Sequence, residues 1–348
     1  MADTAPLPRI FHIHLGLDHG GAETFFVKLA NAFSRRAIPQ SAVVVKGRIW
    51  APKLPKAGFD LHELPLRKGL RGFIDNLRIK RLVKQFKPDV VMVWMNRAAR
   101  RAPAGPWLTV GRLGGYYNLK YYKKCDHLVG NTPDLVDYFV REGWPTARSH
   151  MISNFPDMKA EAPVKRQDFD VPDTAPLLIA LGRLEEMKAF DTLLDAVAKL
   201  PDAYLWLLGE GSLRGALTAQ AEQLGIAHRV RLMGWIANPA AYIAAADIFV
   251  VPSRHEPLGN VILEAWALGK PVVSAASEGP KWLVQDGDNG LLVPVDDAGA
   301  MAHAIGQIAE HKELAQKLIA GGNRTLTEKF SESAIVEAYL DLFSKPKS

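Results

Sequence analysis

Two glutamates eight residues apart, Glu256 and Glu264, lie in the stretch HEPLGNVILEAWALGKPVV at residues 255–273. A strand-length apolar run precedes the stretch, and the pattern predicts a tight loop and then a helix that begins near Asn260. Glu264 would lie one helical turn after Asn260, where its carboxylate can accept hydrogen bonds from the two hydroxyls of a ribose. Glu256 would lie in the loop, nearer to the reacting atoms. For either glutamate alone, a solvent-facing charge is the simpler interpretation.

A basic pair, Arg183 and Lys188, follows another strand-length run in the stretch ALGRLEEMKAFDTLL. Ligands of parallel α/β sheets bind beyond the carboxyl ends of the strands, and both cations would lie at such an end. The arginine fork and the lysine point charge together can hold a diphosphate. A solvated charged loop is the alternative interpretation of this pair on its own.

Two loops that carry glycines also follow predicted strands. Gly20 and Gly21 end the loop after the first strand and open a helix, and Gly209 follows a strand in the stretch LLGEGSLR. Free backbone N–H groups at such positions favour a phosphate ligand. Neither loop has the G-x-G-x-x-G spacing, so each is a weak indication by itself.

The elements that must position these residues alternate between strand-length apolar runs and amphipathic helical patterns. This alternation predicts parallel sheets covered by helices on both faces. It pauses in a proline-bearing stretch at residues 152–176, which we interpret as a linker, and then resumes. The sequence therefore predicts two Rossmann-like, doubly wound α/β domains, at residues 1–155 and 156–330. We expect a last helix at residues 331–345 to pack back on the first domain.

The bulk composition favours a folded cytoplasmic protein. Of 348 residues, 48% are hydrophobic and 23% are charged, and no apolar run is long enough to span a bilayer. The first ten residues lack the basic start and apolar block of a signal peptide. The single cysteine, Cys125, fits a reducing compartment and is interpreted as a packed thiol.

Charge is divided unevenly along the chain, which suggests that the two domains have different partners. Residues 1–155 hold 25 Lys and Arg against 11 Asp and Glu, whereas residues 156–348 hold 18 against 26. We expect the basic half to have an anionic partner, such as a membrane surface or a phosphorylated substrate. A nucleic acid is the third anionic class, but no nucleic-acid-binding motif supports it.

The predicted helix at residues 70–86 carries many of the basic residues. We expect its apolar residues to lie near one face that covers the sheet: Leu70, Phe73, Ile74, Leu77, Val83 and Phe86. Its basic residues would occupy the other positions. The helix could be an interfacial surface for anionic lipid, but an ordinary sheet-covering helix with a solvated face is the interpretation favoured for the helix itself.

Together these stretches resemble the retaining glycosyltransferases of family 4, which have the GT-B fold, two such domains facing across a cleft. The resemblance covers about residues 8–343 and is strongest over 177–296, where the motifs LGRLEEMK, LLGEGSLR, MGWI and the E-x7-E element follow in order. It implies that Arg183 and Lys188 bind the donor diphosphate and that Glu264 accepts the ribose hydroxyls. It also implies that Glu256 and the backbone of Pro257, Leu258, Gly259 and Asn260 contact the donor sugar. The nucleotide base would lie near Gly234, Trp235 and Ile236. Gly20 and Gly21 would close over the phosphates.

The function that the resemblance implies is retaining, metal-independent sugar transfer from a nucleotide diphosphate sugar, with UDP favoured over GDP. Glu256, Arg183 and Lys188 would be catalytic. The acceptor would be a glycan or a lipid-linked glycan of lipopolysaccharide or another surface polysaccharide, handled on the inner face of the cell membrane. Two alternatives stay open: a nucleotide-sugar-binding protein without turnover, and a sugar-nucleotide epimerase of the same fold.

One departure from the family pattern leaves the general base unassigned. Many relatives have a histidine in the first domain near the donor sugar, but the corresponding stretch here, TVGRLGGYYNLKYY, has none. His19, in the first glycine loop, is the best substitute in the sequence. The stretch EGPKWLV, at residues 278–284, also departs from the family pattern.

Overall fold

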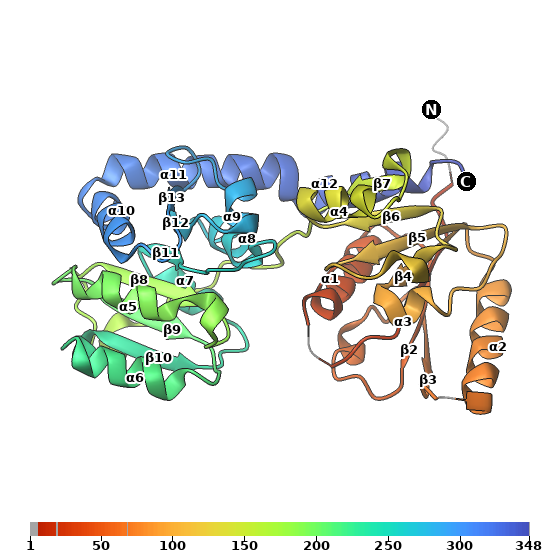
Figure 1. Ribbon diagram of the computed structural model, residues 1–348, viewed down its shortest axis with the longest axis horizontal. Helices are drawn as coiled ribbons and strands as arrows, with labels where there is room; N and C mark the ends of the chain where they lie inside the picture. The colour runs from red at the N-terminus through yellow and green to blue at the C-terminus, as the bar shows by residue number, and fades with distance from the viewer. Residues whose placement is uncertain (1–5, 19, 68, 348) are drawn as a thin grey trace. The chain divides into compact units, whose positions relative to one another are not determined.

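The computed structural model describes residues 6–18, 20–67 and 69–347, and for residues 69–71 the backbone alone (Figure 1). The chain divides into two compact units. Unit 1 comprises Met1–Asn154 and Glu332–Ser348, and unit 2 comprises Phe155–Ser331. His19, the sequence-based candidate for a general base, lies outside the described residues.

Unit 1 is built on a seven-stranded parallel sheet in the order β3-β2-β1-β4-β5-β6-β7. From β1 the sheet continues through β2 to β3 on one side. On the other side it continues from β4 through β5 and β6 to β7, so the winding reverses between β1 and β4. The strands are β1 Ile10–His14, β2 Gln40–Val45, β3 Phe59–Leu64, β4 Val90–Trp94, β5 Leu108–Leu113, β6 His127–Gly130 and β7 Ser149–Met151. The helices are α1 Gly21–Arg35, α2 Gly69–Phe86, α3 Met95–Ala99, α4 Pro133–Arg141 and α12 Glu332–Phe343.

The last helix, α12, belongs to unit 1 although it follows unit 2 in the chain. The ring of Tyr339 packs edge-on against Phe33 of α1, with ring centroids 6.0 Å apart. Its hydroxyl accepts a hydrogen bond of 3.2 Å from Nε of the buried Arg112. Ion pairs at the surface, such as Arg35 with Glu332, add to this contact.

Unit 2 is built on a six-stranded parallel sheet in the order β10-β9-β8-β11-β12-β13. Here the winding reverses between β8 and β11. The strands are β8 Leu177–Leu181, β9 Tyr204–Leu208, β10 Val230–Gly234, β11 Ile248–Val251, β12 Val272–Ala275 and β13 Leu291–Val293. The helices are α5 Phe190–Ala198, α6 Arg214–Gln223, α7 Ala240–Ala245, α8 Asn260–Ala267, α9 Glu278–Leu283, α10 Ala298–Glu310 and α11 Lys312–Thr325.

The core of unit 2 lies on both faces of its sheet, which explains the continuous apolar runs of the sequence. Along β8, Leu178 and Ala180 contribute to one hydrophobic cluster, and Leu177 and Ile179 contribute to the other. Successive side chains of a strand point to opposite faces, so both faces of this strand need apolar residues. The two doubly wound parallel sheets predicted from the alternation are confirmed.

The prediction for the covering face of α2 was wrong. Ile79 and Val83 are buried, but Phe73, Ile74 and Leu77 have exposed fractions of 58%, 42% and 51%. The helix therefore has two apolar faces, and the one that carries Ile79 and Val83 packs on the sheet. Among the described residues, no helix is both long and apolar enough to cross a membrane.

Two histidines of β1, His12 and His14, are fully buried in unit 1. Nε2 of His12 lies 3.1 Å from Gln40 Oε1 and donates to it, and Nδ1 accepts a hydrogen bond of 3.4 Å from Trp94 Nε1. These partners require the neutral ring, because a second ring proton would face the N–H of Trp94. Burial lowers the pKa of His12 from 6.5 to about 4 and that of His14 to about 3.

We predict that unit 1 loses stability as the pH falls below 6.5. The folded-state pKa values lie below those of the unfolded chain, so between pH 6.5 and about 4 unfolding takes up protons. Each histidine then lowers the free energy of unfolding by about 1.4 kcal/mol per pH unit. Urea titrations between pH about 7.5 and about 5.5 measure this slope. The substitution His14→Phe should reduce the slope by one histidine's share, and His303→Phe on the exposed surface of α10 should not; equal slopes in both variants would contradict the prediction.

Candidate functional site

In unit 2, the loops that follow β8 and β11 meet at the point where the sheet reverses its winding. Lys188, at the end of a short 3₁₀ turn (Glu186–Lys188), forms an ion pair through Nζ with Oε2 of Glu256. Their side chains are 16% and 12% exposed, so each charge needs the other to offset its lost hydration. The sequence predicted a role for each residue but not this contact between them.

Further contacts join the same two loops. The backbone N–H of His255 donates to the carbonyl of Met187 at 3.2 Å, and Arg254 donates to the carbonyl of Glu186 at 2.8 Å. Arg254 also pairs with Asp191 of α5 at 2.6 Å. Partial burial raises the pKa of Asp191, but the hydrogen bond and the charge of Arg254, together with backbone hydrogen bonds, outweigh burial and leave that pKa below its usual range. The two loops are therefore held as one surface.

The neighbouring loop after β9 packs against the loop after β8 through glycine. A Cβ atom at Gly209 would lie 1.8 Å from the carbonyl oxygen of Gly182, so a side chain cannot fit there. The N–H of Gly209 donates to the carbonyl of Gly234 at 2.8 Å, which connects the loop to the end of β10. Gly209 therefore has a structural reason to be glycine that is independent of any ligand.

The loop between Glu256 and Asn260 leads into α8. Gly259 adopts φ 86°, a left-handed conformation that favours glycine, immediately before the first helical residue. Leu258 is buried, while Pro257 and Asn260 are exposed. Glu264 follows Asn260 by one turn and is half-buried. The first turn of α8 and the Glu264 carboxylate thus lie on one short helix.

Two site residues that the sequence did not single out, Glu278 and Gly279, begin α9. The carboxylate of Glu278 contacts His255 Nδ1 at 2.7 Å and accepts from the N–H of Glu256 at 3.2 Å. Partial burial raises the pKa of Glu278, but hydrogen bonds from backbone N–H groups and from His255 outweigh it and lower that pKa overall. Gly279 donates to the carbonyl of Glu256 at 2.8 Å. Because the stretch departs from the family pattern, the motif could not identify these two residues. The signal that could have done so is their position after the predicted strand at β12.

Other predicted residues of unit 2 lie apart from the Lys188–Glu256 pair. Arg183 has a 66% exposed side chain and pairs with Glu185, two residues away, at 2.7 Å. Trp235, after β10, is 76% exposed, and Ile236 packs against the core. In this structure Arg183 and Lys188 thus have different carboxylate partners.

In unit 1, Gly20 and Gly21 lie at the start of α1, beyond the carboxyl end of β1 and at the winding reversal of that sheet. Glu23, in the first turn of α1, is buried and accepts a hydrogen bond of 3.0 Å from the N–H of Leu17. A Cβ atom at Gly20 would lie 2.3 Å from Oε2 of Glu23. Glu23 therefore fills the space beneath the glycine loop. Met95, directly after β4, has φ 62°, so backbone strain is stored at this edge of the sheet.

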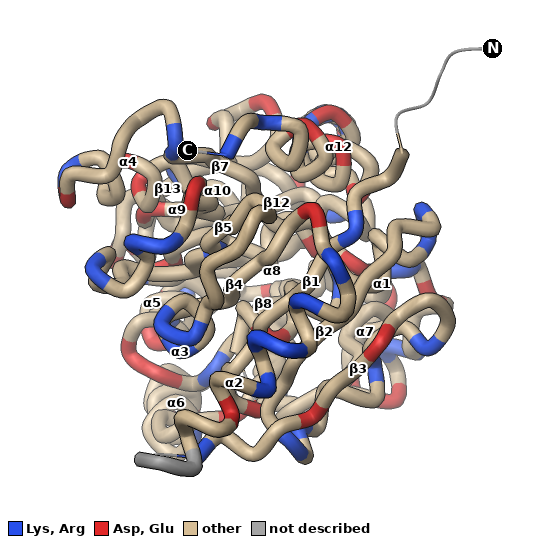
Figure 2. The backbone as a smooth tube through the Cα atoms, turned by 90° about the vertical axis from the view of Figure 1, so that its right-hand side faces the viewer, with Lys and Arg blue, Asp and Glu red and all other residues tan. Residues whose placement is uncertain are grey.

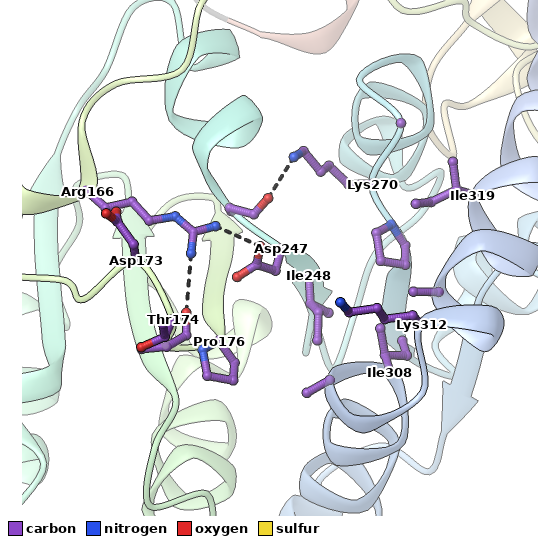
Figure 3. Close-up of a pocket in the computed structure, with 16 residues that line it drawn as sticks. Arg166, Asp173, Thr174, Pro176, Asp247, Ile248, Lys270, Ile308, Lys312 and Ile319 are labelled. Atoms are coloured by element: carbon purple, nitrogen blue, oxygen red, sulfur yellow. Dashed lines mark hydrogen bonds and ion pairs between the residues drawn. The ribbon is translucent and has the colours of Figure 1, made fainter.

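A hollow of about 570 Å³ lies at the opposite, amino-terminal edge of the unit 2 sheet (Figure 3). Two of its three cations have partners: Arg166 pairs with Asp247 at 2.7 Å, and Lys270 donates to the carbonyls of Ala244 and Ala246. Burial lowers the pKa of Lys270. These groups tie α7 and the strand ends together, and we assign them a structural role.

Two Asp-x-Asp spacings occur in unit 2, at residues 168–170 and 286–288, and neither directly follows a strand of the sheet. Asp170 pairs with Arg231 and Asp288 with Arg324. Within the described ranges, no cluster of three or more His, Cys, Asp or Glu side chains could hold a metal ion.

We predict strong energetic coupling between Lys188 and Glu256. Because both are largely buried, Lys188→Gln and Glu256→Gln should each lower the free energy of unfolding by about 1–3 kcal/mol, and the double variant by less than their sum. Urea titrations of the four proteins measure the coupling. The exposed pair Arg324 and Asp288 is the matched control, for which Gln and Asn substitutions should couple by about 0–1 kcal/mol. Additive losses at Lys188 and Glu256 would contradict the prediction.

Comparison with known proteins shows which family this geometry belongs to. The sequence model of the family described as glycosyl transferases group 1 matches residues 175–311, which include both loops of the Lys188–Glu256 pair. The lipopolysaccharide core biosynthesis glycosyltransferase LpsE of Rhizobium meliloti (strain 1021) is 42% identical over 343 residues, covering 97% of this chain and 100% of that protein. LpsD of the same organism, also a lipopolysaccharide core biosynthesis glycosyltransferase, is 38% identical over 97% of this chain and 98% of that protein.

The fold is also that of a solved structure from Anabaena. The crystal structure of Anabaena Alr3699/HepE in complex with UDP and glucose superposes with a TM-score of 0.81, at 20% identity, over 97% of this chain and 100% of that chain. At this identity the likeness concerns the fold, whereas the identity to LpsE and LpsD extends over nearly the whole chain. The chain therefore belongs to the group 1 glycosyltransferases.

Proposed function

We propose that this protein transfers a sugar from a nucleotide diphosphate sugar to a hydroxyl of a lipopolysaccharide core acceptor, with retention of the anomeric configuration and without a metal ion. The similarity to LpsE and LpsD over nearly the full chain supports the acceptor class. UDP is the favoured nucleotide, because Alr3699/HepE was solved with UDP and glucose. The chain has a single cysteine, Cys125, and this low cysteine content supports a location in the reducing cytoplasm.

The Lys188–Glu256 contact at the winding reversal of unit 2 carries the proposal. In sheets of this topology, ligands bind beyond the strand ends at this point. The surface there combines an ammonium group, a carboxylate and the N-terminus of α8, followed after one turn by Glu264. A diphosphate suits the ammonium group and the positive end of the α8 dipole, and the ribose hydroxyls suit the Glu264 carboxylate.

The chemistry follows from how charge moves during transfer. The bond between the anomeric carbon and the diphosphate oxygen breaks, and its electron pair stays on the diphosphate. Lys188 would share its ammonium group between Glu256 and that oxygen, and the exposed Arg183 would add a second cation, which makes a metal ion unnecessary. Glu256 would stabilise the positive charge that develops on the sugar. The acceptor oxygen then bonds to the anomeric carbon, and its proton passes to the departing diphosphate oxygen.

The acceptor side of the reaction belongs, in this proposal, to unit 1. The edge around Gly20, Glu23 and Met95, where Met95 holds a strained backbone, would contact the acceptor. His12 and His14 are enclosed in the core, so neither can meet an acceptor hydroxyl as a base.

The direct test incubates the purified protein with a panel of UDP- and GDP-sugars and a truncated lipopolysaccharide core, with mass spectrometry of the products. A core enlarged by one sugar, whose new linkage keeps the donor configuration by NMR, is the expected result. A changed donor sugar without transfer would indicate an epimerase. Nucleotide binding with neither transfer nor hydrolysis would indicate a binding protein.

Replacement of Glu264 by alanine should weaken UDP binding. The loss of charge-assisted hydrogen bonds to two hydroxyls corresponds to about 1.5–3 kcal/mol, or about a 10- to 100-fold rise in Kd by calorimetry. Glu222→Ala, on the exposed surface of α6, is the control and should leave Kd unchanged. Unchanged affinity of the Glu264 variant for both UDP and GDP would remove the ribose assignment.

Replacement of Arg183 by alanine should reduce turnover far more than stability. Removal of a group that stabilises developing charge costs about 10²–10³ in kcat, whereas an exposed ion pair contributes about 0–1 kcal/mol to folding. Arg324→Ala, at a similarly exposed pair with Asp288, is the control and should lower neither. Initial rates and Tm values compare the two, and a kcat within about twofold of wild type would exclude Arg183 from catalysis.

A further inference from the structure

The side of α2 that faces solvent carries a continuous stripe of six residues, called here the α2 stripe. At 100° per residue, its members lie within a sector of about 120° on the side opposite Ile79. All six are exposed, whereas Asp75, Ile79 and Val83 are buried on the other side. The members are Phe73, Ile74, Leu77, Lys80, Arg81 and Lys84.

The first half of the α2 stripe is apolar. Phe73, Ile74 and Leu77 are 58%, 42% and 51% exposed, and they are neighbours on one helical turn. Single exposed apolar residues need no explanation, but three adjacent large ones indicate an interaction surface. The exposure is part of the fold, since Ile79 and Val83 already fix the opposite face of α2 against the sheet.

The second half of the α2 stripe is basic and has no acidic neighbour on the helix. Asp75 is the one acidic residue in α2, and it is buried, with a hydrogen bond of 3.1 Å from Arg67 Nε. In the described part of the chain, no ion pair involves Lys80, Arg81 or Lys84. Among the described residues, their positive charge is therefore not compensated by an ion pair.

Between these side chains lies a shallow hollow of about 400 Å³, open to solvent. Its lining comes from α2 alone: Leu77, Lys80, Arg81, Lys84 and Gln85. Figure 2 looks onto this side of unit 1, where α2 carries blue basic segments. A hollow bounded by one leucine and three cations suits an anionic head group attached to an apolar chain.

We propose that the α2 stripe docks on an anionic membrane surface, with Phe73, Ile74 and Leu77 inserted among the acyl chains and Lys80, Arg81 and Lys84 at the lipid phosphates. Charge complementarity selects this occupant, because a second copy of the chain paired through the same stripe would offer these three cations no acidic residue. The combination of apolar and basic residues on one exposed helix face is that of an interfacial helix. The proposal rests on α2 alone and does not depend on the proposed transfer reaction.

The first experiment measures co-sedimentation of the full chain with vesicles of phosphatidylcholine, with and without phosphatidylglycerol. Binding should require phosphatidylglycerol and should weaken as salt rises. The variant Lys80→Gln, Arg81→Gln, Lys84→Gln and the variant Phe73→Ser, Ile74→Ser, Leu77→Ser should each raise the vesicle Kd about tenfold or more. The control Lys312→Gln, Lys317→Gln, Lys329→Gln removes the same charge from exposed positions of unit 2 and should bind like wild type.

A second experiment distinguishes insertion from a loose attraction to charge. Because Cys125 is buried, Leu77→Cys can be labelled selectively with an environment-sensitive dye, and its emission should rise and shift to the blue on addition of anionic vesicles. The same dye at Ala219→Cys, on the exposed surface of α6, should not respond. Tm values show whether each variant is folded. Equal binding of the α2 variants and the control, or dimers that depend on the α2 stripe and exclude vesicles, would overturn the proposal.

Discussion

The ion pair between Lys188 and Glu256 is the interaction on which the rest of unit 2 depends. It joins two loops that follow adjacent parallel strands but lie 68 residues apart in the chain. Taking both charges out of water offsets much of their attraction, so the pair contributes more to geometry than to net stability. The same two loops are joined by hydrogen bonds from Arg254 to the carbonyl of Glu186 and from the N–H of His255 to the carbonyl of Met187. A ligand phosphate at this point would meet a cation whose position is already fixed.

Close backbone packing around the pair explains several glycines better than direct ligand binding does. Gly209 lies against Gly182, and Gly279 lies against the carbonyls of Glu256 and Leu258, at separations that exclude a side chain. The strand-end loops can therefore stack on one another with their N–H groups and carbonyls paired. These glycines therefore mark close packing between loops, and the sequence pattern alone does not separate that role from ligand binding.

The sequence predicted these features unequally, for physical reasons. Alternating apolar runs indicated both sheets, because parallel strands buried on two faces must be apolar throughout. The spacing of Glu256 and Glu264 was enough to place one in a loop and the other a turn into a helix. Glu278 was missed because its role comes from hydrogen bonds to His255 and to the N–H of Glu256, which no local spacing encodes. Helical periodicity likewise identifies the apolar residues of α2, but it does not determine which of the two apolar faces packs on the sheet.

The position of Asp75, the one carboxylate of α2, explains which face of the helix packs on the sheet. Asp75 is buried next to Arg67, whose guanidinium outweighs the effect of burial and holds the pKa of that carboxyl below its usual range. An ionised carboxylate in this position needs its partner, so Asp75 fixes the rotation of the helix together with Ile79 and Val83. Phe73 and Leu77 must then face outward. Their apolar surface stays in contact with water and contributes no burial energy to the isolated protein. If the acceptor is held in a membrane, docking through the exposed residues of α2 would bring unit 1 to the surface on which the acceptor lies.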